Sequence, residues 1–172
     1  METRSLMSLD EYLHTSFDDA DREYVDGEVI ERNMGELPHA VIQTELTRVL
    51  LGFVPALKIR VLTEIRIQVS PMRFRVADVA VWRAGDISQR IPTVPPFLVV
   101  EILLAEDRLV RLQPKIQEYL QHGTEWVWVI DPEERRALSY SPVSPGGTLI
   151  DTLTTENPAI AVPLTDLLSV LP

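Results

Sequence analysis

Two acidic residues stand inside strongly apolar stretches of this sequence. Glu101 lies within residues 97–104, and Asp78 lies within residues 76–82. A continuous apolar run of this length is typical of a strand that is buried on both faces of a sheet. An ionised carboxylate in such a strand is costly unless a cation, a metal ion or hydrogen bonds compensate its charge. The two acids therefore indicate one buried, shared polar site.

The chemistry open to such a site depends on whether the two strands are neighbours. If they are, Asp78 and Glu101 can converge, because alternate side chains of a strand share one face. Two carboxylates with bound waters suit Mg²⁺ or Mn²⁺, and the ion could activate a water molecule. The alternative is that each acid forms a structural ion pair with a strand arginine such as Arg66 or Arg75.

A lysine in the next predicted helix could serve the same site. Lys115 follows Leu112 by three residues and precedes Tyr119 by four, so it borders the buried stripe of that helix. From there its ammonium group could orient a nucleophile or stabilise charge on a phosphoryl group. The alternative is an ordinary lysine on a solvent-exposed helix face.

The elements that must position these residues follow from local patterns. Ser8 and Glu11 form a capping box that predicts a helix to about residue 16, and Asp26-Gly27 predicts a two-residue hairpin turn. Apolar periodicity predicts further helices over residues 36–53, ending near Gly52, and over residues 107–122, where Pro114 should kink the helix or mark its regular start.

Further strands and a last helix complete the prediction. Strands are expected at residues 59–69, 75–82, 97–104 and 125–130, with a hairpin of residues 137–141 and 148–153 that turns at 145–147. A short helix is expected over residues 164–171. This order predicts an α/β (α+β) protein, a mixed central sheet flanked by helices, in a single domain spanning residues 1–172.

Composition limits the possible partners and the cellular compartment. The formal net charge of −10 argues against nucleic-acid binding through overall charge. Six arginines could still form a local basic face, or could be outward residues that balance nearby acids: Arg60, Arg66, Arg73, Arg75, Arg83 and Arg90. We expect a cytoplasmic protein without a membrane partner, because cysteine, a signal-peptide pattern and 18 consecutive apolar residues are all lacking.

An ordered set of short segments resembles the Uma2 family of bacterial restriction-endonuclease-like proteins. These segments are residues 23–28, His39, residues 101–103, the spacing from Lys115 to Tyr119, Gly123 and residues 128–132. The resemblance implies a PD-(D/E)XK nuclease-like fold that uses Mg²⁺ or Mn²⁺ to hydrolyse phosphodiester bonds of nucleic acid, with DNA as the expected substrate.

The resemblance also implies roles for individual residues. Asp78 and Glu101 would be the two acids of the motif, and both would bind the metal ion. Leu103 stands where the motif lysine usually lies, so Lys115 would be its counterpart on the helix. Glu23 and His39 match further polar positions of the family pattern, and they complete the predicted catalytic set.

Two functions remain open at this point. One is a metal-dependent endonuclease, and the other is a catalytically inactive nuclease fold that acts as a binding or assembly module. The resemblance also implies a homodimer. The strand with Trp126 and Trp128, and the apolar C-terminal segment 164–171, would offer surfaces for subunit contact.

Overall fold

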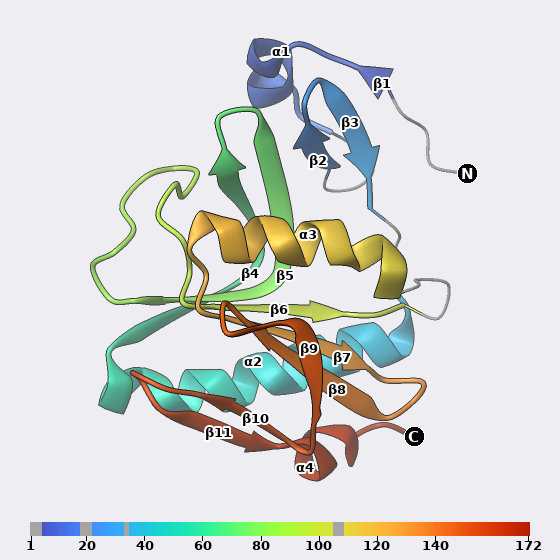
Figure 1. The fold of residues 1–172 in the computed structure, drawn as a ribbon, viewed down its shortest axis with the longest axis vertical. Helices are drawn as coiled ribbons and strands as arrows, with labels where there is room; N and C mark the ends of the chain where they lie inside the picture. The colour runs from blue at the N-terminus through green and yellow to red at the C-terminus, as the bar shows by residue number, and fades with distance from the viewer. Residues whose placement is uncertain (1–4, 18–21, 33–34, 105–108) are drawn as a thin grey trace.

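A nine-stranded mixed sheet is the centre of the molecule (Figure 1). The computed structural model describes residues 5–17, 22–32, 35–104 and 109–172. The helices described there are α1 (Leu9–His14), α2 (Leu37–Leu57), α3 (Leu109–His122) and α4 (Leu164–Leu168). The strands are β1 (Ser5–Leu6), β2 (Arg22–Val25), β3 (Glu28–Glu31), β4 (Ile59–Ser70), β5 (Arg73–Arg83), β6 (Leu98–Ile102), β7 (Trp126–Asp131), β8 (Arg136–Ser141), β9 (Ser144–Ile150), β10 (Thr152–Thr155) and β11 (Ile160–Pro163).

Strand β5 is the hub of the sheet. One of its edges pairs with β4 over almost its whole length, and the other edge pairs first with β2 and then with β6. The sheet order is β1-β3-β2-β5-β6-β7-β8-β9, with β4 beside β5. Only β6 and β7 pair in parallel among these described strands, and α3 connects them. The predicted mixed sheet flanked by helices is confirmed.

Each face of the central strands is covered by different elements. Helix α2, helix α4 and the β10–β11 hairpin share one hydrophobic cluster with the sheet. Helix α3 packs on the opposite face through Ile116 and Tyr119. In Figure 1, α3 crosses in front of β4 and β5, whereas α2 passes behind β7. All five residues of β6 are buried, as the apolar run around Glu101 predicts.

Helix α2 is longer than its sequence pattern indicates. It continues through Gly52 and Pro55 and ends only at Leu57, and the following cap residue Lys58 adopts a left-handed φ of 52°. The predicted end near Gly52 is therefore wrong. An interior glycine costs a helix only about 1 kcal/mol, which packing of the buried stripe can offset. That stripe consists of Ile42, Leu46 and Leu50.

The same helix bears on the expectation that no segment could cross a membrane. Among the described helices, α2 is long and apolar enough by length and composition to do so. The core helix of a soluble protein can have the same length and composition.

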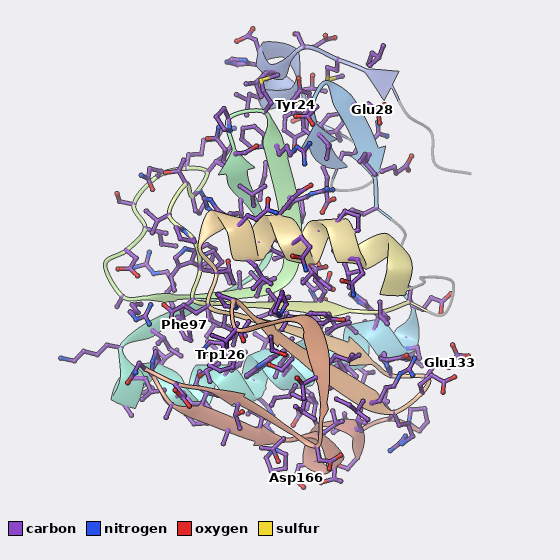
Figure 2. The ribbon with its side chains drawn as sticks, in the orientation of Figure 1. Tyr24, Glu28, Phe97, Trp126, Glu133 and Asp166 are labelled. Atoms are coloured by element: carbon purple, nitrogen blue, oxygen red, sulfur yellow. The ribbon has the colours of Figure 1, made fainter. Side chains whose placement is uncertain are left out.

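The N-terminal elements form as the sequence predicts. Ser8 caps α1 through a hydrogen bond from the Glu11 amide, and Asp26 and Gly27 both adopt positive φ in the β2–β3 turn. Tyr24 packs against Tyr12 and marks the end of the molecule that carries α1 (Figure 2). Within the sheet, at the start of β7, Trp126 donates its amide hydrogen to the Phe97 carbonyl, and the two residues lie close together in Figure 2.

The C-terminal third departs most from the predicted elements. Strand β9 already begins at Ser144, so the β8–β9 turn lies at residues 142–143 and not at 145–147. Pro145 is tolerated within β9 because β9 is the last strand of the sheet, where one backbone edge needs no partner. The β10–β11 hairpin lacks a counterpart in the sequence prediction, and α4 ends at Leu168, before residue 171.

Candidate active site

The two predicted acids lie on neighbouring strands. Strands β5 and β6 pair antiparallel with Val79 opposite Val100, and one step further along this register brings Asp78 opposite Glu101. Directly opposed residues point to the same face of a sheet. Both side chains are buried, at 2% and 5% exposure. Adjacent strands are thus confirmed, while a shared face and joint metal binding stay predictions.

The site occupies a gap along one edge of β5. On that edge β2 pairs with β5 at Phe74, and β6 takes over only from Val79 onward. Between these positions the backbone of Val76 has side-chain partners: its amide donates to Glu23, and its carbonyl accepts from Lys115. Side chains therefore replace a missing stretch of strand pairing, as the pairing of buried backbone groups requires.

The ammonium group of Lys115 joins acids from two strands. Its Nζ lies 2.9 Å from Glu101 Oε2, 2.8 Å from Glu23 Oε1 and 2.8 Å from the Val76 carbonyl oxygen. Three acceptors match the three N–H bonds of an ammonium group. Tyr119, one turn along α3, donates its hydroxyl to Glu101 Oε1 at 2.9 Å. We call Glu23, Glu101, Lys115 and Tyr119 the lysine cluster.

Pro114 does not turn Lys115 away from the sheet. Helix α3 is continuous through Pro114, which lies inside the helix as its sixth residue. The predicted start of this helix at residue 107 lies outside the described residues. Because Lys115 is buried against β5, the alternative of a solvent-exposed lysine is wrong.

Glu23 is also held from the strand side. Arg75 Nη1 lies 2.7 Å from Glu23 Oε2, and the same guanidinium pairs through Nε with Glu118 of α3 at 2.6 Å. Burial would raise the pKa of Glu23, but the charges of Lys115 and Arg75 outweigh it and lower this pKa to about 2. Glu23 is therefore a fixed anion that ties β2, β5 and α3 together.

Asp78 has a different set of partners. Its Oδ1 pairs with the guanidinium of Arg32, which also pairs with Glu64 of β4. Its Oδ2 accepts a 2.7 Å hydrogen bond from the Ile102 amide and lies 3.3 Å from His39 Nε2. We call Asp78, Arg32, Glu64 and His39 the arginine cluster.

These contacts correct the ion-pair alternative considered for Asp78. The arginine partner of Asp78 is Arg32, whereas Arg66 lies over the ring of Tyr12 and Arg75 pairs with Glu23. Burial alone would raise the pKa of Asp78, but the hydrogen bond with His39 and the charge of Arg32 lower it. In turn, burial would lower the pKa of His39, and the contact with Asp78 raises it.

Strand β4 carries a local irregularity beside Asp78. Thr63 pairs with Val79 and Ile65 with Ala77, while Glu64 between them adopts a φ of 48°. A residue with a side chain rarely adopts this left-handed conformation, and holding it costs roughly 1–3 kcal/mol. Gln43 of α2 donates to Glu64 Oε1 at 2.6 Å and to the Asp78 carbonyl at 3.0 Å. At this distortion the Glu64 side chain lies beside Arg32 and Gln43.

The donor set fits a hard divalent cation. Among the described residues, no three His, Cys, Asp or Glu side chains form a ready-made metal cluster. Mg²⁺ often uses only one or two protein carboxylates, with waters and substrate phosphates as further ligands. Burial raises the pKa of Glu101 to about 7; Lys115 opposes this shift, and the charge of Asp78 adds to it. A cation between Asp78 and Glu101 would relieve this repulsion.

A cleft opens next to the arginine cluster. It has a volume of about 400 Å³, and His39 lies in its wall. The opposite walls come from Leu103 and Leu104 after β6 and from the β7–β8 turn with Pro132 and Glu133. Glu133 lies at the surface near this turn (Figure 2). The cleft therefore brings solvent close to His39, and so to the arginine cluster that contains Asp78.

All five predicted site residues fall into the two clusters. The lysine cluster holds Glu23, Glu101 and Lys115, and the arginine cluster holds Asp78 and His39. The sequence reasoning missed Arg32, Glu64, Gln43 and the polar role of Tyr119. Tyr119 was assigned only to the buried stripe of its helix, although a buried tyrosine hydroxyl usually has a hydrogen-bond partner. Arg32 and Glu64 carried no local signal.

The fold and these positions define the class of protein. A mixed sheet flanked by helices, with two buried acids on its central strands, is the arrangement that the resemblance to the Uma2 family implies. The family model of Uma2, described as "Putative restriction endonuclease", matches residues 9–169. The chain belongs to the Uma2 family.

Comparison with solved structures agrees with this assignment. The chain is similar to the crystal structure of a putative nuclease belonging to DUF820 from Anabaena variabilis ATCC 29413, with a TM-score of 0.82 and 24% sequence identity. The match covers 95% of this chain and 98% of that one. At this identity the similarity establishes the fold. Curated proteins include no match to the chain.

Proposed function

We propose that this protein is a metal-dependent endonuclease that hydrolyses phosphodiester bonds of nucleic acid, with DNA as the substrate and Mg²⁺ or Mn²⁺ as the cofactor. One observation carries the proposal. Asp78 and Glu101 are both buried on neighbouring strands, and Lys115 Nζ lies 2.9 Å from Glu101 Oε2. Two acids and a lysine in one buried site are the groups that metal-assisted phosphodiester hydrolysis needs.

The proposal gives each residue of the site a separate role. Asp78 and Glu101 would hold the metal ion, which supplies Lewis acidity and lowers the pKa of a bound water. Lys115 keeps a positive charge beside Glu101: burial would lower its pKa, but the charges of Glu101 and Glu23 raise it. Because all three N–H bonds of Lys115 already have acceptors, this charge would stabilise negative charge on a phosphate oxygen by electrostatic attraction. Glu23 fixes the lysine, and His39 fixes the Asp78 carboxylate.

The nucleic acid must approach an acidic protein through a local surface. Of the arginines considered as a basic face, Arg73, Arg75 and Arg83 pair with acids, namely Asp26, Glu23 and Glu125. This pairing favours the interpretation that they balance nearby charge. We therefore expect weak, strongly salt-dependent binding. The cleft beside His39 is the entry that this proposal assigns to the substrate.

A second function is favoured by a specific contact. The Asp78 carboxylate already has a cation, the guanidinium of Arg32. A nuclease fold whose acids are neutralised internally could act as a binding or assembly module without hydrolysis. The two candidates differ in one measurable property, because only the nuclease needs to bind a divalent ion and cut DNA.

Plasmid nicking separates the two candidates. Purified wild type and the variants Glu101→Gln and Arg48→Gln are incubated with supercoiled DNA and Mg²⁺ or Mn²⁺. Arg48 is an exposed residue of α2 that pairs with Glu45, so its variant is a matched control. We expect metal-dependent nicking that falls about 100-fold or more in Glu101→Gln and is unchanged in Arg48→Gln. Absence of nicking by wild type with either metal would favour the binding module.

We also propose that the protein acts as a homodimer, because cutting both strands of DNA needs two active sites. The apolar surfaces predicted for the subunit contact are mostly covered within the subunit. Trp128, Leu164 and Leu167 are buried in the core, and Val170 of the C-terminal segment is exposed. Sedimentation at tens of micromolar protein tests it, and a monomer with double-strand cleavage would contradict it.

A further inference from the structure

Arg32 stands where a metal ion would be expected to compensate charge. Its guanidinium pairs with Asp78 of β5 and Glu64 of β4, and the negative charge of Glu101 also acts on it. The side chain is 20% exposed, although Asp78 itself is 2% exposed. The positive charge of Arg32 is thus attracted to acids from three strands, in the part of the site nearest to solvent.

The surroundings of Arg32 make it replaceable. Arg32 follows the last residue of β3, so its backbone lies just outside the strand pairing with β2. A guanidinium stays charged at all working pH values, and it can leave these acids only if another cation takes its place. Asp78 keeps two other contacts, with the Ile102 amide and His39, which would hold the carboxylate during such an exchange.

We propose that Arg32 is a built-in counter-ion of the metal site: its guanidinium neutralises Asp78 in the metal-free protein and is displaced when a divalent cation binds. This inference rests on the proposed function, since it takes Asp78 as a metal ligand. It follows that Arg32 lowers the apparent metal affinity, because the ion must compete with two charge-assisted contacts. Removing the guanidinium should therefore strengthen metal binding.

Calorimetric titration of the full chain with MnCl₂ tests the competition. The proteins compared are wild type, Arg32→Gln, Arg32→Lys and the control Arg48→Gln. We expect Arg32→Gln to bind Mn²⁺ at least about tenfold more tightly, which corresponds to about 1.4 kcal/mol. Arg32→Lys should lie between Arg32→Gln and wild type, because a lysine keeps the charge but lacks the planar fork that spans two carboxylates. Arg48→Gln should match wild type.

The outcomes separate this inference from the proposed function. If wild type binds Mn²⁺ and Arg32→Gln binds equally or more weakly, the counter-ion proposal is wrong and the metal site stands. If neither protein binds Mn²⁺, the metal site itself is wrong, and the proposal is wrong with it.

A second measurement needs no variant and covers the case in which Arg32→Gln does not fold. Trypsin cuts after an arginine only when the side chain can enter its pocket, so an ion-paired Arg32 should resist cleavage. Adding Mn²⁺ to wild type should increase cleavage after Arg32 severalfold relative to cleavage after Arg48, as read by mass spectrometry. NaCl at equal ionic strength is the control. An unchanged ratio would contradict displacement of the guanidinium.

Discussion

The two clusters of the site differ in the cation that balances their acids and in how firmly that cation is held. In the lysine cluster the cation is Lys115, which comes from the middle of a packed helix, is 10% exposed and contacts three acceptors. In the arginine cluster the cation is Arg32, which follows a short strand, and its partner Glu64 is 38% exposed. The first arrangement is part of the core, and the second faces a cleft. We infer that the lysine cluster fixes geometry and that the arginine cluster exchanges partners.

The largest expected effect is on the lysine cluster. Replacing Lys115 with methionine keeps the length of the side chain but leaves Glu23 and Glu101 buried without their shared cation. Breaking a buried ion pair in this way costs about 3–5 kcal/mol. Urea unfolding in metal-free buffer should show a loss of this size for Lys115→Met and little change for Arg48→Met. A loss below about 1 kcal/mol would mean that the cluster is not part of the stabilising core.

The next effect is a pH dependence with a defined sign. Burial raises the pKa of Glu101 from 4.5 to about 7, so between these values the folded protein keeps a proton that the unfolded chain releases. The free energy of unfolding should fall as the pH rises from 4.5 to 7, by up to about 3 kcal/mol. Glu23 has a pKa of about 2, so it acts in the opposite sense and adds stability as the pH rises from 2 to 4.5.

The variant Glu101→Gln isolates this effect. It cannot ionise, so unfolding measured between pH 4.5 and 7 should lose most of its slope in the variant. Metal-free buffer is essential, because a bound cation would favour the ionised form. An identical slope in wild type and Glu101→Gln would assign the pH dependence to another group.

The smallest expected effect is on the arginine cluster. Arg32→Gln removes two charge-assisted contacts, but the site can admit water from the cleft, and Asp78 keeps the Ile102 amide as a donor. We expect a loss of only about 1–2 kcal/mol in metal-free buffer. Urea unfolding of Arg32→Gln beside Lys115→Met measures the contrast directly. Equal losses in the two variants would remove the distinction between a fixed and an exchangeable cluster.

The buried core strands could be predicted from the sequence more accurately than the half-exposed strands at the edge of the sheet. The apolar runs around Asp78 and Glu101 are long and buried on both faces, so pattern alone identifies strands β5 and β6. The C-terminal hairpins are half-exposed, and Pro145 with its neighbouring glycines suggested a turn at a place where an edge strand tolerates them. The sequence pattern predicts that helix α2 ends near Gly52. The helix continues because tertiary packing overrides the weak preference of glycine against helix.

The site was predicted in its acids and lysine but not in its charge balance. Asp78, Glu101 and Lys115 stand out because each breaks an apolar pattern or borders one. Arg32 and Glu64 lie in short or irregular strand segments, where a charged residue is ordinary. Their roles depend on the gap between β2 and β6 along β5 and on the left-handed turn of Glu64, and both are properties of the assembled sheet.

A crystal structure of the protein grown with Mn²⁺, with anomalous diffraction to locate the ion, tests directly whether Asp78 and Glu101 form a metal site. We expect an anomalous peak from an ion bound by carboxylate oxygens of both Asp78 and Glu101, with Lys115 still beside Glu101 and Arg32 withdrawn from Asp78. A well-ordered site without such a peak, in crystals that hold millimolar Mn²⁺, would contradict the claim that these two acids form a metal site.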